Sequence, residues 1–214
     1  MNESPAIWLA SYPRSGNTFL RTILWHCFGL RSASVYPKDL GGNSALEEYV
    51  GHIEHGPDGR VRFPANTLRL VKTHELPRDE WPAIYVIRDG RAASVSLWKF
   101  YGKKIPLDEV IEGRHMFGTW ANHVRSWNPW ERRQTLLLHY ESMRSDLPAT
   151  LSSISEFLDS PILKETVPPR DTIAKVDGKW VKKKSDWRED LSGDLLKRFD
   201  EINHAVMVKA GYLS

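Results

Sequence analysis

The chain has 214 residues, of which 41% are apolar and 27% charged, and its formal net charge is +3. This length suits one domain, residues 1–214, with a substantial core, and so modest a charge does not indicate a nucleic-acid-binding protein. No apolar run approaches the roughly 18 to 20 residues that span a bilayer, and the first residues lack the basic and apolar regions of a secretory signal.

The first predicted unit is a strand at residues 7–11, a turn through Pro13 and Gly16, and a helix that ends before Gly29. Cys27 falls within that helix and is the single cysteine. An internal disulfide is therefore excluded, and we expect a small core residue in a reducing, cytoplasmic environment.

Strands alternate with helices along the rest of the chain. Residues 30–66 are irregular, with room for one short helix. Apolar runs predict further strands at residues 68–72, 83–87 and 135–140, and helices are expected at residues 92–101, 117–127, 147–158 and 191–210. We therefore expect an α/β fold, a single domain with a central parallel sheet flanked by helices.

Chemically useful side chains follow each of the main predicted strands. Ligands of parallel α/β sheets gather beyond the carboxyl ends of the strands, so these residues are expected to share one site. They are Arg14 and Ser15, Lys72 and His74, Arg88, and Tyr140.

The stretch SYPRSGNTF, residues 11–19, has the character of an anion-binding loop. Gly16 would let the backbone approach an anion, amides at a helix N-terminus would face it, and Arg14 adds a cation. The stretch lacks the second glycine and the Gly-Lys-Ser/Thr ending of an ATP-binding P-loop. The alternative is an ordinary helix start capped by Asn17 or Thr18.

Two further stretches carry candidate residues. In KTHELP, His74 could take a proton near neutral pH and Lys72 could neutralise charge, although a solvated strand end is the alternative. In RDGRAASVS, Arg88 and Ser96 could hold one phosphate from two sides. The alternative there is an Arg88 paired with Asp89 and a serine on a helix surface.

Together these stretches resemble the sulfotransferases, and the resemblance implies a single α/β domain related to the P-loop nucleotide kinases. SYPRSGNTF resembles their 5′-phosphosulfate loop, Tyr-Pro-Lys-Ser-Gly-Thr-Thr-Trp. KTHELP resembles their Lys-Thr-His-x-x-Pro segment, and IRDGRAASVS their 3′-phosphate motif. GTWANHVRSW, LLLHYESM and SDWRED echo further family segments in the same order, so the resemblance spans residues 6–213.

The resemblance implies sulfuryl transfer from 3′-phosphoadenosine 5′-phosphosulfate (PAPS) to a hydroxyl, or alternatively an amine, of a small-molecule acceptor. It implies His74 as the general base, with Lys72 and Arg14 beside it, and 3′-phosphoadenosine 5′-phosphate (PAP) as the product. No metal is expected. The cofactor-binding residues that it implies are Arg14, Ser15, Gly16, Asn17, Thr18, Phe19, Arg88, Ser96, Tyr140, Lys182, Lys183 and Lys184.

The sequence departs from the family pattern in three places. Arg14 replaces a lysine, which makes protonation of the leaving group by this residue less credible. Phe19 replaces a tryptophan that stacks on adenine. The family's Arg-Lys-Gly-x-x-Gly-Asp-Trp loop lacks both glycines here, so the sequence does not say which of Lys182, Lys183 and Lys184 would reach the 3′-phosphate.

Acceptor contacts are expected from residues 35–63 and 102–116. Trp98, Phe100, Tyr101 and Phe117 could line an aromatic wall, with core packing as the alternative for at least two of them. Two other functions stay open: a P-loop nucleotide kinase-like phosphotransferase, and a catalytically inert nucleotide-binding protein of the same fold. Neither the acceptor nor the oligomeric state can be predicted from the sequence.

Overall fold

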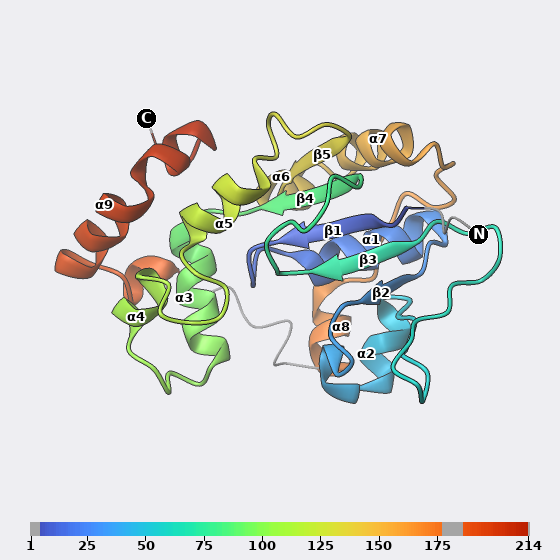
Figure 1. Ribbon diagram of the computed structural model, residues 1–214, viewed down its shortest axis with the longest axis horizontal. Helices are drawn as coiled ribbons and strands as arrows, with labels where there is room; N and C mark the ends of the chain where they lie inside the picture. The colour runs from blue at the N-terminus through green and yellow to red at the C-terminus, as the bar shows by residue number, and fades with distance from the viewer. Residues whose placement is uncertain (1–4, 177–185, 214) are drawn as a thin grey trace.

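The computed structural model describes residues 5–176 and 186–213. Within these residues the chain forms a five-stranded parallel sheet in the order β2-β3-β1-β4-β5 (Figure 1). The strands are β1 (Ile7–Ser11), β2 (Ser32–Ser34), β3 (Leu70–Thr73), β4 (Ala83–Ile87) and β5 (Thr135–His139). The predicted parallel sheet is confirmed, and β2 is an edge strand that its three polar and small residues did not predict.

Helices surround the sheet, and each of the predicted helices is present. They are α1 (Asn17–Phe28), α2 (Ser44–Tyr49), α3 (Gly90–Phe100), α4 (Leu107–Ile111), α5 (Trp120–Trp127), α6 (Tyr140–Ser145), α7 (Leu147–Leu158), α8 (Arg170–Val176) and α9 (Gly193–Lys209). Short 3₁₀ turns η1 (Asp39–Gly42) and η2 (Trp187–Glu189) complete the set. The short helices α4, α6 and α8 were not predicted, because five to seven residues carry too little periodicity.

The C-terminal end of α1 and the start of α5 follow from local chemistry. Gly29 ends α1 as predicted, and its N–H donates to the carbonyl of Trp25. Helix α5 begins at Trp120 rather than at residue 117, because the Thr119 side chain accepts a hydrogen bond from the N–H of Asn122.

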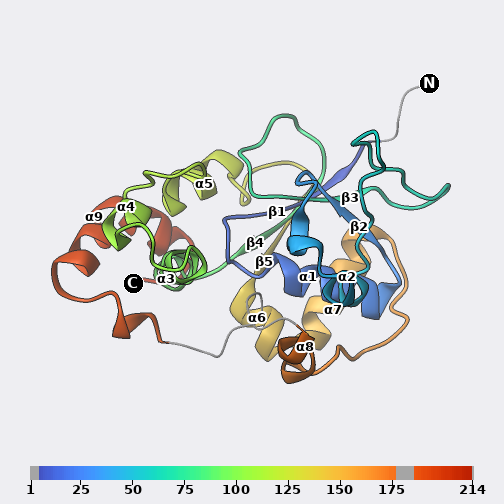
Figure 2. The ribbon, with the colours of Figure 1, turned by 90° about the horizontal axis from the view of Figure 1, so that it is seen from below.

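Alternate residues of the central strands face two separate cores. Leu9 of β1 and Ile84 of β4 pack with α1 and α7, whereas Ala10 and Tyr85 pack with α3, α5 and α9. Figure 2 shows α1, α2, α6, α7 and α8 together on one side of the sheet. Strand β4 is buried along its whole length, as its continuous apolar run predicted.

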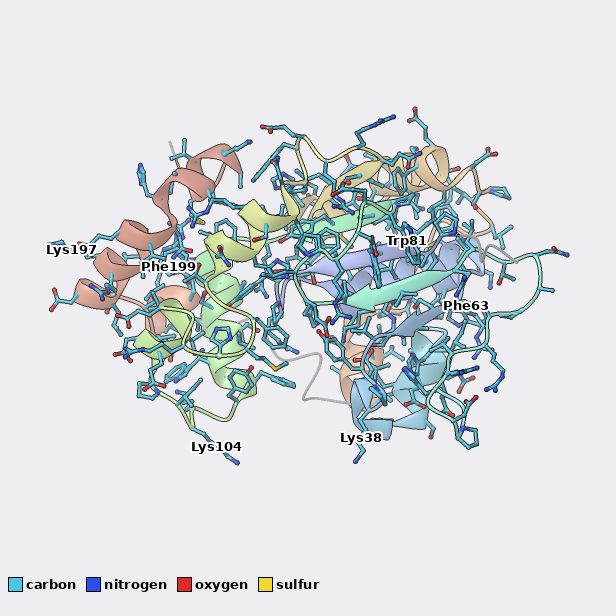
Figure 3. All side chains as sticks on the ribbon, viewed as in Figure 1. Lys38, Phe63, Trp81, Lys104, Lys197 and Phe199 are labelled. Carbon is cyan, nitrogen blue, oxygen red and sulfur yellow. The ribbon has the colours of Figure 1, made fainter. Side chains whose placement is uncertain are left out.

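A second group of helices, α3, α4, α5 and α9, lies beyond the carboxyl ends of the strands (Figure 1). In Figure 3, Lys104 and Lys197 extend outward from this group, and both are exposed. Phe199 of α9 is fully buried and would contact any side chain added at Gly90 of α3. The loops that carry the candidate residues therefore lie between the sheet and a tightly packed helical group.

Cys27 is fully buried in α1, as expected for a core residue. Burial raises the pKa of its thiol. Among residues 5–176 and 186–213, no helix is both long and apolar enough to cross a membrane.

Candidate functional site

The loop between β1 and α1 turns sharply through backbone conformations that favour glycine. Gly16 has φ 109° and precedes the first residue of α1, and no side chain caps the helix. A Cβ at Gly16 would collide with the ring of Tyr140. The alternative of an ordinary start capped by Asn17 or Thr18 is therefore wrong, and the first N–H groups of α1 are left for another partner.

Two buried polar atoms at this helix start have no hydrogen-bond partner among the described residues. Ser15 is fully buried and its Oγ makes no hydrogen bond, and the same holds for Oδ1 of Asn17. The Asn17 Nδ2 donates instead to the carbonyl of Leu9, at 2.8 Å, which fixes the side chain inward. An unsatisfied buried hydroxyl beside a helix N-terminus suits a phosphate or sulfate oxygen.

Arg14, Arg88 and Ser96 come together around the same loop. Arg14 Nε donates to Ser96 Oγ at 3.3 Å, and an Arg88 NH1 donates to the carbonyl of Arg14 at 2.9 Å. Burial and the neighbouring Arg88 lower the pKa of Arg14 to about 10, so it stays charged at neutral pH. Asp89 pairs with Arg91 at 2.8 Å, not with Arg88. The alternative pairing of Arg88 with Asp89 is therefore wrong.

Tyr140 joins these residues from the end of β5. Its ring lies under the guanidinium of Arg88, with 4.8 Å between Arg88 Cζ and the ring centroid. It begins α6 rather than ending the strand. Phe19 is partly buried and packs on the core beneath α1. Thr18 is also partly buried, and its carbonyl accepts from the hydroxyl of Thr22.

His74 follows β3 directly, and its ring is held by the end of β1. Nδ1 lies 2.8 Å from the carbonyl oxygen of Ser11, so Nδ1 carries the proton and donates it. The neutral ring then has its lone pair on Nε2. Burial and the nearby Lys72 hold the pKa of His74 well below 6.5, which keeps the ring neutral at physiological pH.

A second histidine supports the backbone of His74. His123 of α5 is fully buried, and its Nε2 donates to the carbonyl of His74 at 3.0 Å. Its Nδ1 lies 2.8 Å from the hydroxyl of Tyr85. Burial lowers the pKa of His123 to about 4. Neither His123 nor Tyr85 was predicted as a site residue. A lone histidine on the apolar face of a helix is a signal that could have pointed to His123.

Lys72 lies at the buried end of β3, within an ion-pair cluster. It is 3% exposed, and its Nζ contacts Asp39 Oδ1 at 2.5 Å. Arg21 of α1 contacts the other oxygen, Oδ2, at 2.6 Å. The alternative of a solvated strand end is therefore wrong. Asp39 and Arg21 were not predicted, because an aspartate in a loop and an arginine in a helix are ordinarily solvent-exposed.

The pKa values in this cluster follow from burial and pairing. Burial alone would raise the pKa of Asp39, but Lys72 and Arg21 outweigh it and hold that pKa below its usual range. Burial lowers the pKa of Lys72, and Asp39 opposes that shift. The carboxylate of Asp39 therefore favours the charged form of Lys72.

Aromatic side chains surround the His74 ring. Tyr36 stacks on it at 6.0 Å between centroids, and Phe117 meets it edge-on at 6.0 Å. The backbone N–H of His74 donates to the hydroxyl of Tyr36. Of the predicted aromatic wall, Phe117 is thus at the site, and Phe100 lies against Arg14. The Trp98 indole N–H donates to the carbonyl of Ile105. Tyr101 packs on the core beside His115.

The last predicted site residues are the three lysines of the basic loop. Lys182, Lys183 and Lys184 lie outside the described residues. Within residues 5–176 and 186–213, no three His, Cys, Asp or Glu side chains gather as a metal site requires.

Comparison with known proteins places this chain in a family. Residues 4–176 match the family described as Sulfotransferase domain. Sulfotransferase 1 family member D1 of Rattus norvegicus is 29% identical over 186 residues, which cover 75% of this chain and 61% of the relative. The chain thus spans less than two thirds of that relative's length.

Two solved structures share the fold. Mouse sulfotransferase SULT7A1 complexed with PAP aligns with a TM-score of 0.61 at 21% identity, over 95% of this chain and 84% of that chain. Retinol dehydratase in complex with androsterone and the inactive cofactor PAP gives 0.61 at 18% identity, over 94% and 80%. Since the family match covers most of the residues, the chain belongs to the sulfotransferase domain family.

Proposed function

We propose that the chain transfers a sulfuryl group from PAPS to a hydroxyl of a small-molecule acceptor. One observation carries this proposal: the Ser11 carbonyl, at the base of the anion loop, holds Nδ1 of His74 at 2.8 Å. A neutral base is thereby fixed next to a loop built for an oxyanion. Such a pairing suits an in-line displacement, in which positioning and charge stabilisation supply most of the rate.

The chain's own residues fit the two charged ends of PAPS. The unsatisfied Ser15 hydroxyl and the uncapped start of α1 suit the 5′-phosphate. Arg88 and Ser96 are assigned to the 3′-phosphate, which ATP does not have. When bound, PAPS supplies the sulfuryl group and the leaving group. The PAP bound to mouse sulfotransferase SULT7A1 supports PAPS as the donor.

Proton transfer is assigned to His74. Its Nε2 lone pair would accept the proton of the acceptor hydroxyl, and the Ser11 carbonyl would stabilise the imidazolium that forms. Lys72 and Arg14 are the cations assigned to the charge that develops during transfer. Arg14 stays protonated at neutral pH, so we assign it to charge stabilisation and not to proton donation.

The acceptor is proposed to lie against the aromatic rings around His74. Tyr36 and Phe117 contact the ring directly. Tyr36 lies within residues 35–63 and Phe117 directly follows residues 102–116, the two segments expected to bind the acceptor. Androsterone bound to retinol dehydratase is an example of a small hydroxylated ligand in this fold. We place the reaction in the cytoplasm, in line with the single, buried thiol of Cys27.

Radiolabelled PAPS offered with a panel of phenols, alcohols and amines tests this function. Label should pass to an acceptor with the wild-type chain and not with His74→Ala. Strict dependence on Mg²⁺ with ATP as donor would show the kinase-like alternative instead. Tight PAP binding with no transfer to any acceptor would show an inert nucleotide-binding protein.

A further inference from the structure

Asp39 stands at the centre of a buried cluster that joins four segments of the chain. The Asp39 cluster consists of Asp39 of η1, Arg21 of α1, Lys72 of β3, and His52, which follows α2. Each member is at most 5% exposed. Figure 3 shows the neighbouring Lys38 pointing away from the molecule. Asp39 itself is buried, at 5% exposed. A buried carboxylate of this kind needs strong partners, since an unpaired one is costly.

The charges within the cluster do not cancel. Lys72 and Arg21 share the one carboxylate of Asp39, each taking a different oxygen. An Arg21 NH2 lies 2.7 Å from His52 Nδ1, which must accept because the guanidinium only donates. Burial and Arg21 lower the pKa of His52 to about 4, so its ring is neutral. With Lys72 protonated, its charge and that of Arg21 exceed the single negative charge of Asp39, so the cluster is net positive close to the proposed base.

The cluster is joined to the residues around His74 by more than one contact. Lys72 and His74 are two residues apart at the end of β3, and Lys72 Nζ lies 5.3 Å from the ring centroid of Tyr36. The same Tyr36 accepts from the backbone of His74 and stacks on its ring. Whatever fixes the Lys72 ammonium thus fixes a positive charge beside the proposed base.

We propose that Asp39 is the positioning residue for Lys72, holding its ammonium charged and in place beside His74 at the sulfuryl-transfer site. The inference rests on the proposed function. Lysine has a flexible four-carbon stem, and two guanidinium groups, of Arg21 and Arg14, repel its charge. Asp39 opposes both effects, since its oxygen holds Nζ while its charge offsets theirs.

Within residues 5–176 and 186–213, charged and titratable groups from several segments face Lys72. They are Asp39 of η1, Arg21 of α1, Arg14 of the anion loop, His74 after β3, and Tyr36 after β2. Of these, only Asp39 is negative in the folded protein. Its removal should therefore shift the titration of Lys72 in one direction, toward lower pH.

The Asp39→Asn variant tests the proposal through two readouts. The lysine Cε resonance that disappears in Lys72→Met identifies Lys72 in the NMR spectrum, and in Asp39→Asn it should titrate at a lower pH than in the wild type. Turnover should fall at least about tenfold at neutral pH, with its alkaline limb at lower pH, while PAP affinity changes less than about threefold.

Glu131→Gln is the matched control, because it removes the same charge from an exposed pair with Lys209, outside the segments expected to bind the acceptor. It should leave turnover, its pH profile and the Lys72 resonance unchanged. An Asp39→Asn variant with an unshifted Lys72 titration and a wild-type pH profile would overturn the proposal. A wild-type chain that transfers no sulfuryl group, with the NMR shift present, would refute the proposed function and not the link between Asp39 and Lys72.

Loss of Asp39 leaves two buried cations, so the single variant could fail to fold. Comparing Lys72→Met with Lys72→Met/Asp39→Asn removes that difficulty, since only Arg21 then remains charged. Asp39→Asn should lower turnover less than about threefold when Lys72 is absent. A further loss of about tenfold or more in the double variant, with thermal unfolding intact, would show that Asp39 does not act through Lys72.

Discussion

The Nδ1 atom of His74 lies 2.8 Å from the carbonyl oxygen of Ser11, an atom that can only accept a hydrogen bond. This contact joins the ends of two adjacent parallel strands, β1 and β3. It sets which ring nitrogen carries the proton and leaves the lone pair on Nε2. The anion loop that follows β1 and the proposed base that follows β3 are thus held as one unit, and the predictions below depend on that arrangement.

Replacing His74 should separate chemistry from binding. His74→Ala should lower turnover by at least about 100-fold, because no other group at this position can take the acceptor proton. PAP affinity, measured by titration calorimetry, should stay within about twofold. His204→Ala, at an exposed histidine of α9, is the control. A large loss of PAP affinity in His74→Ala would count against the role as base.

The pH dependence of turnover should report the unusual state of His74. Burial and Lys72 hold its pKa well below 6.5. A general base acts when unprotonated, so a lowered pKa keeps it active as the pH falls. The acid limb of kcat should therefore lie below pH 6.5. An acid limb with its midpoint at or above pH 6.5 would contradict this assignment if it disappears in His74→Ala.

Arg88 should contribute mainly to nucleotide binding. Arg88→Ala should weaken PAP binding by about 1 to 3 kcal/mol, through loss of a charge-assisted contact. Part of that loss comes from the loop, because Arg88 also holds the carbonyl of Arg14 at 2.9 Å. Arg125→Ala, at an exposed arginine of α5, controls for the change in net charge. Unchanged PAP affinity in Arg88→Ala would remove Arg88 from the site.

Gly16 should not tolerate even one added methyl group. Its φ of 109° is unfavourable for other residues, and a Cβ would collide with the ring of Tyr140. Gly16→Ala should cost about 2 kcal/mol or more of unfolding free energy, with a parallel loss of PAP affinity.

Gly59→Ala separates the backbone cost of an alanine at positive φ from the cost of the collision with Tyr140 at Gly16. Gly59 has φ +73°, and a Cβ there would have no atom within 4 Å, so only the backbone cost of about 1 kcal/mol applies. Denaturant unfolding of the two variants measures the difference. Equal destabilisation would show that the contact between Gly16 and Tyr140 does not constrain the loop.

Stability should fall in mild acid because His123 is buried in its neutral form. Burial lowers its pKa to about 4 from the usual 6.5. Below pH 6.5 the unfolded chain binds a proton that the folded chain does not, so the unfolding free energy drops as the pH falls. His123 alone should account for roughly 3 kcal/mol by pH 4.

Urea denaturation between neutral and mildly acid pH tests this. His123→Gln should flatten the decline, leaving the part due to other buried histidines such as His52. His204→Gln, which changes an exposed histidine, should keep the wild-type slope. A slope in His123→Gln equal to that of the wild type would show that His123 is not the group that titrates.

The sequence determined the parallel sheet, the long helices and the glycine turn before α1, because these depend on local patterns. Apolar runs at residues 7–11 and 83–87 identify strands without reference to the rest of the chain. Short elements such as α4 and β2 escaped prediction, since they are too brief to show a period and are stabilised by their neighbours.

Only the tertiary structure decided which side chains act on one another. The pattern of His74 and Lys72 could be read locally, but the partners Ser11 and Asp39 lie 63 and 33 residues away in the sequence. Hydrogen bonds and ion pairs between such distant residues depend on the order of the strands in the sheet and leave no periodic mark in the chain. For that reason the sequence identified the candidate base and cation, whereas the fold decided the tautomer of the base and the partner of the cation.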